Sequence, residues 1–207
     1  MGKLPVSNTV YVFDTVYDND IEKLRAMLNS SEKFDLNYLE PQMDITALML
    51  SILRRDNMMT DILLEDNRIK VNTVNSVGVS ALMMACRYGD QFLVKKLLKM
   101  GATIQTTDYL YFSNPCHIAV LSGKLEVIEV LKSTSINWND PDWQGDTPLH
   151  LAVLNDEPEI LHSLLQVENI NICKKNKENL SAFEIAMQEG NWIAINLFNE
   201  YIINKEK

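Results

Sequence analysis

The sequence predicts an all-α solenoid of stacked helix-turn-helix units with short β-hairpin or loop fingers. Three observations predict this fold. One motif recurs about every 34 residues, each copy opens with a helix-capping residue, and each copy continues into an amphipathic second helix. One helix pair cannot bury its own apolar face, so the units must share one elongated core. We therefore expect a single domain over residues 1–207 rather than two globular domains.

The recurring motif is clearest where Gly-Asp-Thr-Pro-Leu-His-Leu-Ala occupies residues 145–152. Thr147 suits the helix N-cap, and Pro148 suits the first helical turn. A Ser, Thr or Asn stands at the same place in the other copies, followed two positions later by an apolar residue. A small residue then recurs, which lets a neighbouring helix approach closely. These small residues are Ser51, Ala85, Ala119, Ala152 and Ala186.

A helix break and a second helix follow in each copy. The break is Gly89, Gly123 or Gly190 in three copies, and Asp156 or Arg55 in two others. Gly and Asp tolerate a left-handed turn, whereas Arg does so less readily. The second helices carry apolar residues on one stripe, which predicts that one face is buried. In the third copy the stripe is Leu93, Val94, Leu97 and Leu98.

These residues resemble the ankyrin repeat, and the best matches are Thr147-Pro148-Leu149-His150 and Gly101-Ala102-Thr103-Ile104. The resemblance implies six repeats. The first repeat lacks the Thr-Pro-Leu-His sequence, as expected where a terminal repeat faces water on one side. The repeats cover approximately residues 8–37, 38–72, 73–105, 106–139, 140–173 and 174–207.

Charge and cysteine content exclude several classes of function. The formal net charge is -9, and an acidic surface repels nucleic acid and anionic membranes. No apolar run reaches the roughly 18 residues of a membrane span. The three cysteines, Cys86, Cys116 and Cys173, lie far apart and do not suggest a disulfide framework. We therefore expect a reducing compartment, cytoplasmic or nuclear.

The sequence offers no catalytic, metal-binding or cofactor-binding pattern. His117 and His150 occupy the repeat's histidine position, which by resemblance hydrogen-bonds neighbouring turns. His162 has no Cys or His partner at zinc-ligand spacing. Cys116 and His117 are adjacent, so on a helix their side chains diverge, and Cys116 replaces a core Leu. We expect no enzyme activity and no cofactor.

The resemblance implies that a partner protein binds at the finger tips and at the ends of the first helices. Aromatic residues and Arg, the usual interface anchors, are frequent at these positions. Alternatively, the fingers fold over and pack these side chains on one another. The predicted partner-binding residues are Tyr17, Met43, Ile45, Leu53, Arg54, Val77, Arg87, Tyr88, Leu110, Tyr111, Leu121, Trp143 and Leu154.

Two local features carry hypotheses of their own. Tyr109-Leu110-Tyr111-Phe112 replaces the polar, glycine-containing turn of the other repeats. Either this finger is distorted or it is the centre of the binding site, and we favour the second. Asn72 resembles the ankyrin asparagine that can be hydroxylated. A turn Asn that caps its loop explains the same residue, and we favour that interpretation.

The sequence thus predicts a monomeric adaptor, scaffold or inhibitor that docks another protein on its concave face. Two alternatives stay open. One is a non-catalytic regulatory subunit of an enzyme or channel assembly, and the other is a pathogen or viral effector. The sequence does not name the partner.

Overall fold

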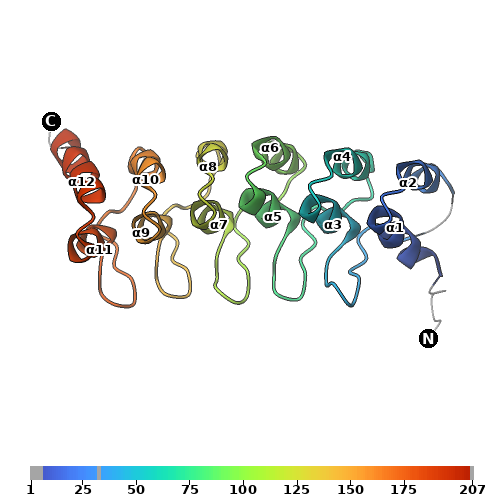
Figure 1. Ribbon diagram of the computed structural model, residues 1–207, viewed down its shortest axis with the longest axis horizontal. Helices are drawn as coiled ribbons and strands as arrows, with labels where there is room; N and C mark the ends of the chain where they lie inside the picture. The colour runs from blue at the N-terminus through green and yellow to red at the C-terminus, as the bar shows by residue number, and fades with distance from the viewer. Residues whose placement is uncertain (1–6, 32–33, 206–207) are drawn as a thin grey trace.

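The computed structural model describes residues 7–31 and 34–205, and helices dominate this part of the chain. They pair along the sequence, a short helix followed by a second one (Figure 1). In order they are α1 (Ser7–Tyr17), α2 (Ile21–Leu28), α3 (Ala47–Leu53), α4 (Asn57–Glu65), α5 (Ala81–Tyr88), α6 (Gln91–Lys99), α7 (Pro115–Leu121), α8 (Leu125–Leu131), α9 (Pro148–Leu154), α10 (Pro158–Leu165), α11 (Ala182–Glu189) and α12 (Trp192–Lys205).

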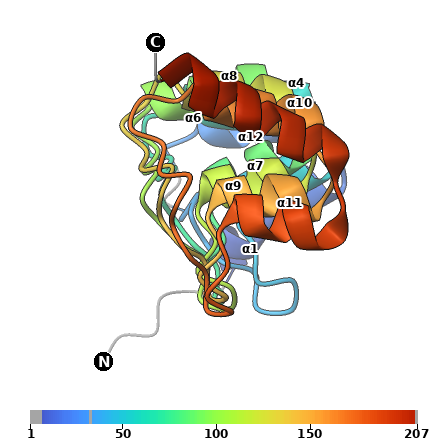
Figure 2. The same ribbon diagram turned by 90° about the vertical axis from the view of Figure 1, so that its left-hand side faces the viewer.

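The helices form two parallel rows. The odd-numbered, inner helices lie side by side, the even-numbered, outer helices form a second row, and the loops before α3, α5, α7, α9 and α11 project to one side as fingers (Figure 1). Viewed along the stack, the pairs superimpose (Figure 2). The predicted all-α solenoid is therefore confirmed. The repeat limits stay a prediction, since residues 1–6, 32–33 and 206–207 lie outside the described ranges.

Small residues set the spacing of the inner row. Each of the five predicted small residues is at most 1% exposed, so the neighbouring helices close over them. A side chain larger than Ser at these places would push two repeats apart. Cys116 is also fully buried, at the place that Leu82 and Leu149 occupy in other repeats, and it packs there as a small apolar residue.

Caps and left-handed turns define each helix pair. Thr46, Ser80 and Ser181 each accept a hydrogen bond from the backbone N–H three residues on, as the sequence predicts. The turn between the two helices has a positive φ in every repeat. Arg55 adopts φ 56° there despite its side chain, because the flanking helices fix the turn.

The two motif histidines join successive repeats. The Nε2–H of His117 donates to the carbonyl oxygen of Asp140 (3.0 Å), and that of His150 donates to Leu180 (3.1 Å). In each ring Nδ1 accepts from the backbone N–H of the helix cap. Each neutral imidazole thus connects its own helix to the next finger, which confirms the structural role predicted for them.

Asparagines after the outer helices form a second set of ties. The side-chain amide of Asn72 donates to Gly101 O (2.9 Å) and its carbonyl accepts from Thr103 N (2.8 Å). Asn37 and Asn139 bridge to their next repeats in the same way. Both polar atoms of the Asn72 amide are engaged within the stack, which supports its interpretation as a structural residue.

The fingers are loops closed by one hydrogen bond across their base rather than extended strands. In the 142–146 finger, Asp142 N donates to Asp146 O (2.8 Å), while the Asp142 carboxylate accepts from two backbone N–H groups of the loop. Neighbouring fingers are also joined: Tyr109 N donates to Val77 O and Trp143 N to Tyr111 O, both at 2.9 Å. These bonds join the 75–79, 108–113 and 142–146 fingers into one wall beside the inner helices.

The aromatic 108–113 finger keeps this scheme and is one residue longer than the 142–146 finger. Asp108 N donates to Ser113 O (3.1 Å). Phe112 sits at φ 51°, where the neighbouring fingers have Gly78 and Gly145. A bulky residue in the left-handed region is strained, and such strain is common at functional sites.

We expect acid to weaken the stack through its histidines. Burial lowers the pKa of His117 and His150, so at mildly acidic pH the unfolded chain binds protons that the folded chain does not bind. The free energy of unfolding should fall as the pH drops from 7.5 to 5.5, across the ordinary histidine pKa, by at most about 1.4 kcal/mol for His117. Urea denaturation of the native chain and of an H117Q/H150Q variant measures this. An equal loss of unfolding free energy in the native chain and in the variant would show that the histidines do not cause the acid sensitivity.

We expect Phe112→Gly to stabilise the fold by about 1 kcal/mol, because Gly accepts a positive φ without steric cost. Phe112→Ala is the matched control: it removes the same ring but keeps the Cβ, so it should give no such gain. Urea denaturation of both variants measures the difference. Destabilisation by Phe112→Gly would mean that the ring contributes packing that outweighs the strain.

Candidate functional site

An apolar groove runs between the fingers and the inner helices α3, α5 and α7. We call it the central groove. Its volume is about 540 Å³, and most of its lining is aliphatic or aromatic. Its lining residues are Ile45, Leu53, Asn75, Val77, Val79, Met83, Met84, Arg87, Tyr88, Asp108, Leu110, Tyr111, Ser113, Ile118, Leu121 and Ser122.

Most of the predicted partner-binding residues meet in this groove. Two others, Trp143 and Leu154, line a neighbouring hollow of about 370 Å³ beside α9 and α11. Tyr17, Met43 and Arg54 line neither. Those in the central groove are Ile45, Leu53, Val77, Arg87, Tyr88, Leu110, Tyr111 and Leu121.

Some of these positions offer less to a partner than the sequence suggests. Ile45 is only 9% exposed, because it is part of the buried apolar core. The Arg54 guanidinium donates to the carbonyl oxygens of Val16 and Tyr17 and lies 5.3 Å from the centre of the Tyr17 ring. These contacts tie α1 to α3. Tyr17 and Arg54 therefore have a structural role of their own.

Sequence reasoning missed part of the lining. Met84 and Ile118 lie one helical turn before Tyr88 and Ser122, so the helical period places them on the same face. The helical period could therefore have identified Met84 and Ile118 from the sequence. No comparable signal marks Asp108, whose role depends on how its finger folds.

Asp108 organises the aromatic finger. It is 6% exposed, and its carboxylate accepts from Leu110 N (3.0 Å), Tyr111 N (2.7 Å) and Ser113 N (3.1 Å). These bonds hold Leu110 and Tyr111 over the groove, although both side chains are more than half exposed. Tyr111 also contacts Trp143, with ring centres 6.3 Å apart. The central groove and the neighbouring hollow therefore meet at an aromatic pair.

The groove carries one accessible cation. Arg87 is exposed at the C-terminal end of α5, and among the described residues it makes no hydrogen bond, ion pair or ring contact. Its neighbours in the stack are engaged: Arg54 lies over Tyr17, and Arg55 lies 5.3 Å from the centre of the Tyr88 ring. The lining carboxylate of Asp108 is saturated by backbone donors.

The titratable groups of the core are not arranged for catalysis. Burial raises the pKa of the Cys86 and Cys116 thiols far above the ordinary range, which disfavours the nucleophilic thiolate. His117 and His150 use both ring nitrogens within the fold. None of these groups faces the central groove.

One polar cluster on the outer row contains residue types that are common in active sites, but their arrangement is not catalytic. Ser163 Oγ donates to Glu129 Oε1 (2.5 Å), and Lys132 Nζ lies 3.1 Å from that carboxylate and 3.2 Å from Ser163 Oγ. The hydrogen bond from Ser163 lowers the pKa of Glu129. Because Ser163 is 6% exposed and its hydroxyl is donated, the cluster joins α8 to α10 and offers no nucleophile.

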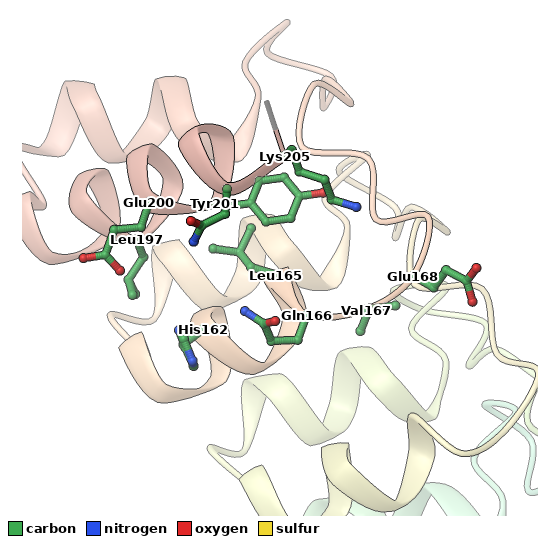
Figure 3. A pocket seen from close by; sticks show the side chains of 10 residues that line it. His162, Leu165, Gln166, Val167, Glu168, Leu197, Glu200, Tyr201 and Lys205 are labelled. Carbon is green, nitrogen blue, oxygen red and sulfur yellow. The ribbon is translucent and has the colours of Figure 1, made fainter. Parts of the chain in front are cut away.

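A second hollow, of about 360 Å³, lies between α10 and α12 on the outer row. Figure 3 shows His162 and Glu200 on one side of it and Glu168 on the opposite side, so these groups do not converge on a common point. Within residues 7–31 and 34–205, no group of three or more His, Cys, Asp or Glu side chains is placed to hold a metal ion. Over the same residues, every helix is too short or too polar to cross a membrane.

Comparison with known proteins identifies the repeats. The family pattern described as ankyrin repeats (3 copies) matches residues 13–108 and 113–207. An ankyrin repeat protein of fowlpox virus is 27% identical over 168 residues, 78% of this chain and 49% of the viral protein. Human Rabankyrin-5 is 26% identical over 153 residues, 69% of this chain and 13% of that protein. An E3 ubiquitin-protein ligase of Arabidopsis thaliana is 26% identical over 177 residues, 72% of this chain and 34% of the ligase.

The chain spans about half or less of the length of these curated relatives. What they share with it is the repeat array, a module for protein–protein interaction. Because the two matched segments cover nearly all of the sequence, and the helix pairs stack as the repeat requires, the chain belongs to the ankyrin repeat family.

Proposed function

We propose that this chain is a non-catalytic binding module that docks one partner protein in the central groove, as an adaptor, scaffold or inhibitor. The observation that carries the proposal is the convergence of exposed apolar and aromatic side chains on one groove. Exposed apolar surface of this kind costs solubility unless a partner covers it. Leu110, Tyr111 and Leu121 are each about half exposed or more, and aromatic side chains are frequent interface anchors.

The rest of the site supports a docking role. Among the described residues that line the groove, no acid, base and nucleophile are placed together. The net charge of -9 argues against nucleic acid as the partner. We further propose that the chain acts as a monomer. Its free cysteines support a second proposal, that it works in the reducing environment of the cytoplasm or nucleus.

A second candidate function is that of a viral effector, which the fowlpox relatives favour. A regulatory subunit of a larger assembly would use the same groove. Size-exclusion chromatography of native extract separates these roles, since an obligate subunit co-purifies with its assembly in fixed stoichiometry and an adaptor or effector exchanges.

We expect a Y111A/W143A variant to lose its partner while it stays folded. Affinity purification with quantitative mass spectrometry, from cells that express the chain, should show at least about a tenfold drop in the captured partner. The melting temperature should move by less than about 4 °C, because both side chains are half exposed.

An F92A/W192A variant is the matched control. These aromatic residues are exposed at 75% and 72% but lie on the outer helices α6 and α12, away from the groove. Equal losses with both double variants would contradict docking in the groove. A large drop in melting temperature for Y111A/W143A would instead assign those residues to the fold.

A further inference from the structure

The charged groups that line the central groove indicate what kind of partner segment it can bind. The chain has 28 acidic and 19 basic residues, yet among the described residues that line this groove the one accessible charged group is the guanidinium of Arg87. The other lining charge, Asp108, is buried, and three backbone N–H groups already satisfy its carboxylate. The groove thus pairs an apolar surface with a single cation.

The helix end explains part of this arrangement but not all of it. A cation in the last turn of α5 is favourable because the helix dipole is negative there. Lys99 stands in the same place on α6, where it faces solvent outside the groove. Arg87 differs in that it lines the central groove, together with apolar and aromatic residues such as Tyr88 and Leu121.

An unpaired guanidinium at the edge of an apolar groove is suited to a carboxylate. Arg offers a planar fork that binds both carboxylate oxygens. Arg54 and Arg55 cannot supply it as readily, because both guanidinium groups lie over tyrosine rings.

We propose that the partner presents a peptide segment in which a large apolar side chain is next to an Asp or Glu. The apolar side chain enters the central groove between Leu110, Tyr111 and Leu121, and the carboxylate pairs with Arg87. This inference rests on the proposed function and adds the chemistry of the partner segment to it.

A charge-swap selection tests the inference. A displayed library of random 12-residue peptides is selected in parallel on the native chain, on R87E and on K99E. The native chain and K99E should enrich peptides that have Asp or Glu beside an aromatic or large aliphatic residue. R87E should enrich Lys or Arg at that place instead. A peptide selected on the native chain should bind R87E at least about tenfold more weakly, and salt should weaken its binding to the native chain.

A groove variant, L121E, separates the two proposals. Peptides that lose binding to L121E but show no acidic preference, and that bind R87E as well as the native chain, would overturn the inference and leave docking in the groove intact. If no enriched peptide is sensitive to L121E, both proposals fail. Circular dichroism of L121E, a half-exposed position, verifies that the variant is folded.

Discussion

The structure depends on the close contact between inner helices at five small side chains. Ser51, Ala85, Ala119, Ala152 and Ala186 are buried almost completely, so each inner helix lies against the next with no room for a longer side chain. The outer helices and the fingers take their positions from this row. Because every repeat touches only its neighbours, a change at one small residue should disturb two adjacent repeats and spare the distant ones.

Apolar contact alone would not fix how one repeat is turned relative to the next, since it has little directional preference. Hydrogen bonds supply the direction. The imidazoles of His117 and His150 reach the next finger, and the amides of Asn37, Asn72 and Asn139 reach the next outer loop. A buried polar group left without its partner is costly, so these bonds hold the stack in one arrangement. Burial lowers the pKa of both histidines and so favours the neutral imidazole, and the hydrogen bonds engage both ring nitrogens within the fold.

The groove is a consequence of this stacking. Several side chains at the ends of the inner helices and on the fingers line the groove, where the contacts between repeats leave them partly exposed. Here they are apolar and aromatic around Tyr111 and Leu121, with one unpaired guanidinium at Arg87. The 108–113 finger keeps the backbone scheme of its neighbours through Asp108, yet it holds Phe112 at a positive φ. Strain retained at an exposed position is consistent with a role in binding rather than in folding.

The sequence by itself determined the repeat, the caps, the buried small residues and the structural role of the histidines. Each of these depends on the spacing of residues along the chain, and the helical period fixes which face of a helix such residues occupy. The partner-binding role of the predicted site residues stays a prediction, although residues such as Tyr111 and Leu121 do line one groove in the structure. Tertiary structure decided the rest. It alone shows that Arg54 is bound to Val16 and Tyr17, that Ile45 is covered, and that Asp108 supports the aromatic finger. Those facts depend on contacts between residues distant in sequence or on the path of a loop, and neither follows from periodicity.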